Sequence, residues 1–133
     1  VFEGAHDLLE LLTDKGIPTA LVTNNTDDNT RLLLERFDLR FDVVLTRDSG
    51  FYKPSGQPIR EAVRRLGVDA GRCFAVGDSR YDILAARDAG LAGVCIVNDT
   101  DGRFAEEADH SFPTVQGFIR FLKVVLPDPR SSA

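Results

Sequence analysis

Hydrophobic residues recur along the chain in two alternating patterns. The first is a helical spacing, which predicts helices with one buried face. The second is a short run that is apolar throughout, which predicts strands buried on both faces. Strands that alternate with helices in this way predict an α/β fold with a doubly wound parallel sheet covered on both sides. The predicted helices lie at 5–15, 27–37, 59–66, 80–89 and 114–125, and the predicted strands at 17–23, 41–46, 73–77 and 93–97.

The extent of the domain follows from the same pattern. Gly67 and Gly90 each follow the last apolar position of a helix, where a glycine commonly ends it. No internal repeat, low-complexity tract or linker divides the chain. We therefore expect one core domain at residues 1–126 and a frayed tail at residues 127–133.

Composition narrows the class of function. The net charge of −5 argues against nonspecific nucleic-acid binding, which needs clustered Lys and Arg. No apolar run approaches the ~20 residues of a membrane span, and the first residues have no signal-peptide pattern. Cys73 and Cys95 have neither metal-ligand nor disulfide spacing, so we expect free thiols in a cytoplasmic protein. His6 and His110 are expected at the surface or hydrogen-bonded.

Polar groups gather where the predicted strands end, which is the edge where open α/β sheets bind ligands. The first strand leads into Thr23, Asn24 and Asn25, a hydroxyl and two amides before a helix N-terminus, and this combination suits a phosphate. The alternative is an ordinary turn with an N-cap. The loop after the second strand brings Lys53, which Pro54 holds in an extended conformation. A lone lysine is usually solvated, so this signal is weak by itself.

An acidic pair follows the third strand. Asp78 ends the strand and Asp82 lies four residues further on, so the two carboxylates can face one cavity. Two such carboxylates suit Mg²⁺, which prefers oxygen ligands and keeps several waters. The alternative is that Asp78 caps the following helix and Asp82 complements its dipole. Hydroxyl, cation and paired carboxylates together form the set that holds a phosphoryl group and a metal.

The order of these groups resembles the haloacid dehalogenase-like (HAD) superfamily, in particular its phosphoglycolate phosphatase-like and β-phosphoglucomutase-like members. The resemblance implies that Thr23 and Asn24 bind the phosphoryl oxygens and that Lys53 neutralises their charge. It implies further that Asp78 ligates Mg²⁺, and that Asp82 binds the ion through water or holds Lys53 in place. Thr23, Lys53 and Asp78 are thus the implied catalytic residues. The matching motifs are Thr23-Asn24-Asn25, Lys53-Pro54 and Gly77-Asp78-Ser79-x-x-Asp82.

The first motif of that superfamily, a strand ending in Asp-x-Asp, has no counterpart in these 133 residues. Asp99-Thr100-Asp101 has the pattern, but it follows an edge strand and we assign it to a loop. The missing strand belongs between those that carry Thr23 and Asp78, so a central gap with unpaired backbone groups is expected. Three solutions are open: direct pairing of the flanking strands, a strand from another chain, or a marginal fragment. The chain has no Met and begins with Val1, which indicates a beginning that is missing, processed or cloned away.

The leading hypothesis is the partial core of a Mg²⁺-dependent HAD-type phosphatase that hydrolyses a small phosphate monoester through an aspartyl-phosphate. Without the nucleophile, the isolated chain is expected to be nearly inactive. The alternative is a catalytically inactive HAD-like binding or interaction domain. A receiver-type signalling domain is a poor match, because Thr46 stands where its acceptor aspartate would be. The expected partners are a small phosphorylated metabolite and either a second copy or a missing N-terminal segment that completes the sheet, but no nucleic acid or membrane.

Overall fold

The computed structural model describes residues 4–49 and 55–126. Its helices lie where the apolar spacing predicts them, and the strands occupy the central residues of the predicted runs. The tail predicted at 127–133 lies outside the described residues. In chain order the elements are α1 (Ala5–Asp14), β1 (Ala20–Val22), α2 (Asp27–Arg36), β2 (Val43–Leu45), the 3-10 helix η1 (Arg47–Ser49), α3 (Gln57–Leu66), the 3-10 helix η2 (Ala70–Arg72), β3 (Phe74–Gly77), α4 (Arg80–Asp88), β4 (Gly93–Ile96), β5 (His110–Ser111) and α5 (Val115–Val125).

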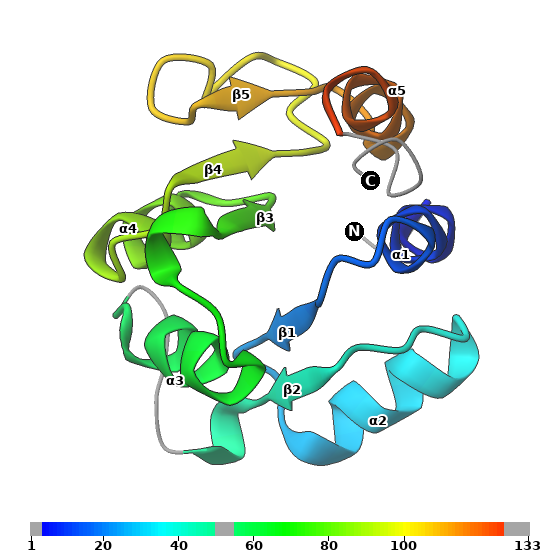
Figure 1. Ribbon diagram of the computed structural model, residues 1–133, viewed down its shortest axis with the longest axis vertical. Coiled ribbons are helices and arrows are strands. Elements are labelled where there is room, and N and C mark those ends of the chain that lie inside the picture. The colour runs from blue at the N-terminus through cyan, green and yellow to red at the C-terminus, as the bar shows by residue number, and fades with distance from the viewer. Residues whose placement is uncertain (1–3, 50–54, 127–133) are drawn as a thin grey trace, which may run out of the picture.

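The strands form two parallel sheets. β1 pairs with β2, and β3, β4 and β5 form the second sheet in that order (Figure 1). The predicted α/β class with parallel strands is confirmed. β5 was not predicted, because His110 and Ser111 are polar and lie at the end of a stretch assigned to a loop. Its backbone is nevertheless paired with β4, with His110 opposite Cys95.

β1 and β3 are the inner strands of the two sheets, and no ladder joins them in the described part of the chain. On β3, Phe74 is 61% exposed and Val76 is 43% exposed, although both are large and apolar. In a parallel ladder, alternate residues direct their backbone groups to the same neighbour. The Gly77 carbonyl accepts the Val97 N–H at 2.8 Å on the β4 side, so Phe74 and Val76 direct their backbone groups away from β4. Direct pairing of the flanking strands, one of the three solutions left open, therefore does not occur between the described residues.

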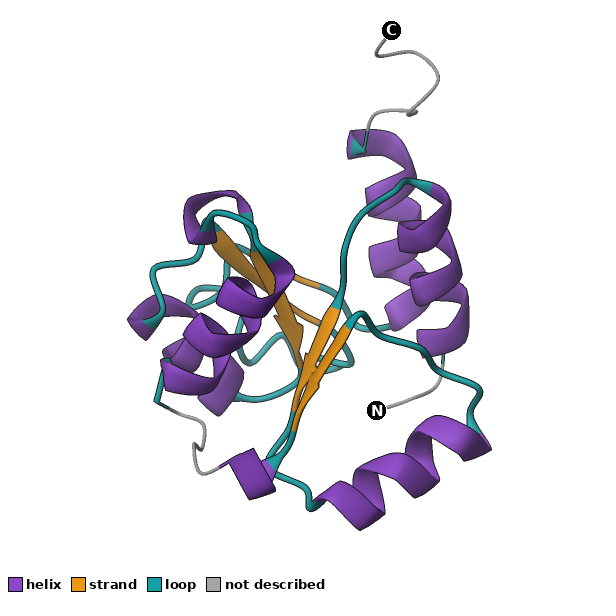
Figure 2. Cartoon of the chain, turned by 60° about the horizontal axis from the view of Figure 1, so that its bottom comes forward, coloured by secondary structure: helices purple, strands orange, loops and turns teal. Residues whose placement is uncertain are grey.

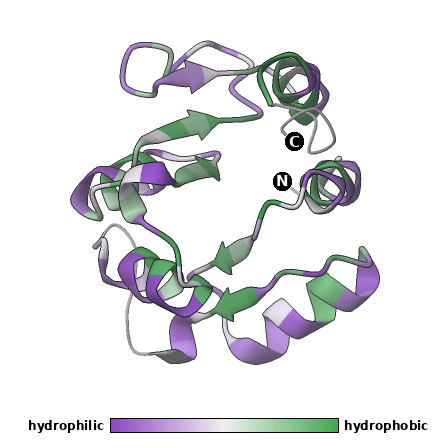
Figure 3. Ribbon diagram, in the orientation of Figure 1, coloured by the Kyte–Doolittle hydropathy of each residue, from purple (hydrophilic) through white to green (hydrophobic). Residues whose placement is uncertain are grey.

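Helices cover the strands from both sides (Figure 2), and apolar residues concentrate on strands β1 to β4 and on the helices (Figure 3). α3 and α4 pack over one face, where Val22 of β1 also contacts the core. α5 covers β4 on the other face and packs against α1. The buried residues of the first cluster are Ile59, Ile83, Ala85, Ala86, Ala89, Val94, Ile96 and Ala108, and those of the second are Cys95, Val97, Val115, Phe118 and Ile119.

Local signals set the helix ends. The Thr26 hydroxyl accepts the Asn29 N–H at 3.3 Å at the start of α2, and the Thr114 hydroxyl accepts the Gly117 N–H at 3.0 Å at the start of α5. Gly67 ends α3 with φ of 71°, a left-handed conformation that suits glycine. Among the described helices, none has the length and apolar character needed to cross a bilayer.

The structure also shows the surroundings of single residues for which the sequence made predictions. Cys73 and Cys95 are free thiols, as predicted. The loop assignment of Asp99-Thr100-Asp101 is confirmed: the buried Asp99 carboxylate accepts the N–H groups of Arg103 at 2.8 Å and Phe104 at 2.9 Å. The prediction that the preceding strand is an edge strand was wrong, because β4 pairs with β5 as well as with β3. Thr30 is the buried residue of α2, and the Phe37 side chain at the end of the helix is 40% exposed.

Candidate functional site

Thr23 lies directly after β1, at the carboxyl end of the strand, as the sequence predicts. Its N–H donates to the Leu45 carbonyl at 3.0 Å, which ties the strand end to β2. Its hydroxyl oxygen accepts the Asn25 N–H at 3.2 Å. Asn24 is exposed between them. This tight turn places a hydroxyl and successive backbone groups just before the N-terminus of α2, where an anion is stabilised.

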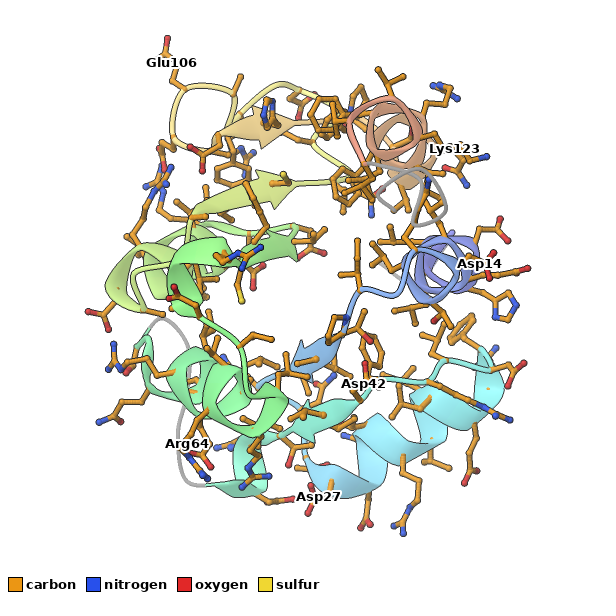
Figure 4. All side chains as sticks on the ribbon, in the orientation of Figure 1. Asp14, Asp27, Asp42, Arg64, Glu106 and Lys123 are labelled. Carbon is orange, nitrogen blue, oxygen red and sulfur yellow. The ribbon has the colours of Figure 1, made fainter. Side chains whose placement is uncertain are left out.

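A cluster of polar groups at the start of α2 supports this turn. The Thr46 hydroxyl donates to the Asp27 carboxylate, and the Asp27 N–H donates to the Asp48 carboxylate at 2.8 Å. The Arg47 N–H donates to the Asn25 carbonyl at 2.9 Å. Figure 4 labels Asp27 where α2 begins, beside η1. The end of β2 is thus fastened to the start of α2, and the Thr23–Asn25 turn is held between them.

The acidic pair forms a second turn, between β3 and α4. One carboxylate oxygen of Asp82, Oδ2, accepts the N–H groups of Asp78 at 3.0 Å and Ser79 at 3.1 Å, and also the Ser79 hydroxyl at 3.1 Å. Ser79 and Asp82 form a capping box at the start of α4. A Cβ at Gly77 would lie 2.3 Å from the Asp82 carboxyl carbon, so this approach of the carboxylate requires a glycine there.

The alternative interpretation of the acidic turn, in which Asp78 caps α4, agrees with the structure only in part. Ser79, and not Asp78, is the N-cap residue, and Asp82 completes the cap from the first helical turn. Sequence reasoning missed this role of Ser79, although Ser-x-x-Asp matches the capping-box signature. Asp78 is exposed at the strand tip. Asp82 therefore shapes the backbone that presents Asp78.

The metal-binding potential of the site rests on few ligands. Among the described residues, no three His, Cys, Asp or Glu side chains come together as a metal group. The exposed Asp78 carboxylate at the strand tip is an oxygen donor of the type that Mg²⁺ uses, and one or two protein carboxylates suffice when water and substrate phosphates supply the rest. Lys53, the predicted cation of the site, lies outside the described residues together with Pro54. The structure therefore places Thr23, Asn24, Asp78 and Asp82 and leaves the position of Lys53 undescribed.

Several titratable groups other than the predicted site residues have shifted pKa values. Burial, with Asp109 nearby, raises the pKa of the Cys95 thiol to about 11, so this cysteine is a protonated core residue and no nucleophile. Hydrogen bonds from Ser111 and from the backbone lower the pKa of Asp99 in its loop. Hydrogen bonds from Arg64 and Arg65 lower the pKa of Glu61 to about 2 on the surface of α3. These groups stabilise local structure.

Comparison with protein families matches residues 1–96 to the family described as haloacid dehalogenase-like hydrolase. A phosphoglycolate phosphatase of Neisseria gonorrhoeae is 42% identical over 89 residues, which cover 65% of this chain and 38% of that protein. The pyrophosphatase PpaX of Bacillus velezensis is 35% identical over 98 residues, which cover 70% of this chain and 45% of that protein. The chain thus spans less than half the length of these curated relatives.

The fold is shared with longer solved structures. A provisionally assigned beta-phosphoglucomutase from Thermotoga maritima superimposes with a TM-score of 0.81 and 27% sequence identity, over 92% of this chain and 60% of that chain. Because the superposition covers 92% of this chain, it includes strands of both sheets. The two sheets are therefore placed relative to each other as the corresponding strands are in that longer protein.

Proposed function

The chain belongs to the haloacid dehalogenase-like hydrolase family, and we propose that it supplies the phosphate- and metal-binding part of a phosphatase site for a small phosphate monoester. The observation that carries this proposal is the placement of Thr23 and Asp78. Each follows the carboxyl end of the inner strand of its sheet. Ligands of open α/β sheets bind beyond these strand ends, so we expect one phosphate ester between the two sheets to contact both residues.

Each site residue has a role that its chemistry supports. The Thr23 hydroxyl accepts the Asn25 N–H, which leaves its own proton for a phosphoryl oxygen. Asn24 adds a second polar contact, and Lys53 neutralises the charge of the phosphoryl group. Asp78 and Asp82 would hold Mg²⁺, Asp78 directly and Asp82 through water. Such an ion supplies charge stabilisation for the transferred phosphoryl group.

The nucleophile is proposed to come from outside these 133 residues. An aspartate carboxylate of the Asp-x-Asp motif attacks phosphorus and the P–O ester bond breaks, while the second aspartate of the motif donates the proton with which the alcohol leaves. Water then hydrolyses the aspartyl-phosphate to inorganic phosphate and the free carboxylate. The backbone groups that β3 directs away from β4, together with the exposed Phe74 and Val76, favour an extended apolar segment beside them. We propose that a strand ending in Asp-x-Asp is seated between β1 and β3, either from an N-terminal segment or from another chain.

A complementation experiment tests this function. The purified chain is mixed with a synthetic apolar strand peptide of about eight residues, a length typical of strands, that ends in Asp-x-Asp. The matched control peptide ends in Asn-x-Asn. We expect Mg²⁺-dependent hydrolysis of p-nitrophenyl phosphate with the first peptide only, and binding of both peptides. Robust hydrolysis by the chain alone would refute an external nucleophile, and failure of both peptides to bind would refute the strand site.

A second candidate is a HAD-like domain that binds a phosphorylated metabolite without turnover. The observation that favours it is the absence of Asp-x-Asp after any apolar strand except β4. The two candidates differ in the sequence that precedes Val1 in the gene. A strand ending in Asp-x-Asp there supports the phosphatase, and a nearby start codon without it supports the binding domain. Either protein is proposed to act in the cytoplasm, and the open strand edges favour self-association when no strand fills the gap.

A further inference from the structure

Thr30 is a buried polar residue that the proposed site does not use. It lies on the inner face of α2 and is only 3% exposed. Its N–H donates to the Thr26 carbonyl at 2.9 Å in the ordinary helical manner. Its hydroxyl oxygen is buried and has no hydrogen-bond partner among the described residues. A threonine hydroxyl in a helix commonly bonds the carbonyl four residues earlier, and here it does not.

A buried hydroxyl without a hydrogen-bond partner destabilises the folded protein, so buried polar groups of this kind are nearly always paired with protein or water. A small cavity of about 10 Å³ lies between β1 and α2, next to Thr30. Thr30 and Thr23 both line it, together with Asn25 and three leucines. A volume of this size corresponds to roughly one water molecule, and buried waters are held by polar groups of this kind. Thr30, with its unpaired hydroxyl, and the residue proposed to bind phosphate therefore line the same cavity.

We propose that one buried water bridges the Thr30 and Thr23 hydroxyls, and that Thr30 is thereby a positioning residue for the phosphate site. This inference rests on the proposed role of Thr23. The water forms the hydrogen bond with the Thr30 hydroxyl that no described protein group provides. At its other end it donates to the Thr23 oxygen.

The consequence for Thr23 follows from counting its hydrogen bonds. A hydroxyl has one proton and two lone pairs. One lone pair of Thr23 accepts the Asn25 N–H at 3.2 Å. When the bridging water donates to the second lone pair, the Thr23 proton has to point away from both donors. It is then available to a phosphoryl oxygen without first breaking another hydrogen bond, which is the preorganisation that favours anion binding.

Three variants of the chain test the inference. Thr30→Val removes the hydroxyl and keeps a β-branched side chain of similar shape, so helix propensity and packing change little. Thr30→Ser keeps the hydroxyl and is the matched control. Thr23→Val removes the proposed phosphate ligand itself. The readouts are magnetisation transfer from a long-lived water to the Thr30 side chain by NMR, the urea midpoint of unfolding, and titration with inorganic phosphate followed at the Asn25 amide.

The expected result is a long-lived water signal in the wild type and in Thr30→Ser that Thr30→Val loses. Thr30→Val should weaken phosphate binding about threefold to tenfold, the effect of about one hydrogen bond, without raising the urea midpoint. A higher midpoint for Thr30→Val with no water signal in the wild type overturns the inference, because it indicates a dry cavity. Weaker phosphate binding in Thr23→Val but not in Thr30→Val overturns the link between the two residues. If Thr23→Val leaves phosphate binding unchanged, the proposed function loses its phosphate ligand, while the water signal and the midpoint still decide the cavity.

Discussion

Asp82 was predicted to bind a metal ion, and in the structure its carboxylate accepts hydrogen bonds from the backbone. Its Oδ2 atom accepts three hydrogen bonds from Asp78 and Ser79, and these hold the turn between β3 and α4. Gly77 makes room for this carboxylate, since any Cβ there would overlap it. The direction in which the turn presents Asp78 therefore depends on Asp82. A change at Asp82 should disturb the fold as well as the candidate site.

We expect Asp82→Ala to lower the free energy of unfolding by about 1–2 kcal/mol, because it removes a helix cap and leaves N–H groups unpaired. Asp82→Asn should cost less, since its amide oxygen can still accept. Urea denaturation followed by circular dichroism measures both. The control is Asp78→Asn, an exposed change of the same kind that should stay within about 0.5 kcal/mol of the wild type. Equal small effects at both positions would show that the capping box contributes nothing.

Asp109 gives a prediction for pH dependence. Its carboxylate accepts the Val94 N–H at 2.7 Å and pairs with Arg87 at 3.1 Å, and these contacts lower its pKa below the usual value of 3.8. The unfolded chain then binds protons at a higher pH than the folded chain, so the stabilisation is present above the usual pKa and is lost as pH falls through the lowered one. Asp109→Asn should flatten the loss of stability that occurs as the pH falls below about 4. Asp101→Asn, the same charge change in the same connection between β4 and β5, is the control.

At the scale of elements, β3 differs from an ordinary strand of a parallel sheet. Its central residues are partly exposed, whereas every residue of β4 is buried. The chemistry of the strands does not explain the contrast, because both are apolar and both pair in parallel. The cause is position: β4 has a neighbour on each side, and β3 has one on only one side. Stability should therefore respond very differently to the same substitution in the two strands.

Val94→Ala in β4 is expected to cost about 1.5–3 kcal/mol, because the Val94 side chain is fully buried. Val76→Ala in β3 should cost less than about 0.5 kcal/mol, since Val76 is 43% exposed. Urea unfolding of the two variants measures the difference. In the presence of a bound strand peptide, the cost of Val76→Ala should rise toward that of Val94→Ala. A large cost for Val76→Ala in the chain alone would contradict an open edge at β3.

The elements show what the sequence could and could not predict. Long periodic segments such as α3, with Gly67 at its end, were predictable because the signals are local. β5 was not, because its strand character comes from pairing with β4 and its residues are polar. The positions of Thr23 and Asp78 directly after two strands were also predictable, because each apolar run ends at a polar residue, while their roles stay predictions. The buried hydroxyl of Thr30 could not be found, because nothing in a helical pattern shows whether a threonine has a partner.

At the scale of the whole molecule, the two sheets are unequally supported. The largest fully buried side chains, Val94 and Ile96, belong to β4. β1 contributes only the partly buried Val22 to the margin of a core cluster, and all three of its residues are half-buried. The sheets are linked mainly through α3, which packs on β1 and β2 and contacts α4. Local opening of the β1–β2 sheet should therefore cost less free energy than opening of the β3–β5 sheet.

Native-state hydrogen exchange should reveal this difference directly. We expect the paired amides of β1 and β2 to exchange about tenfold faster than those of β4, or faster still, which corresponds to at least about 1.4 kcal/mol between the two opening reactions. A strand bound between β1 and β3 would pair with both inner edges, so protection in β1 should rise toward that of β4 when the strand peptide is added. A scrambled peptide of the same composition is the control and should leave the difference unchanged. Equal protection of β1 and β4 in the chain alone would show that the two sheets already unfold as one unit, and that the open edges do not divide the molecule.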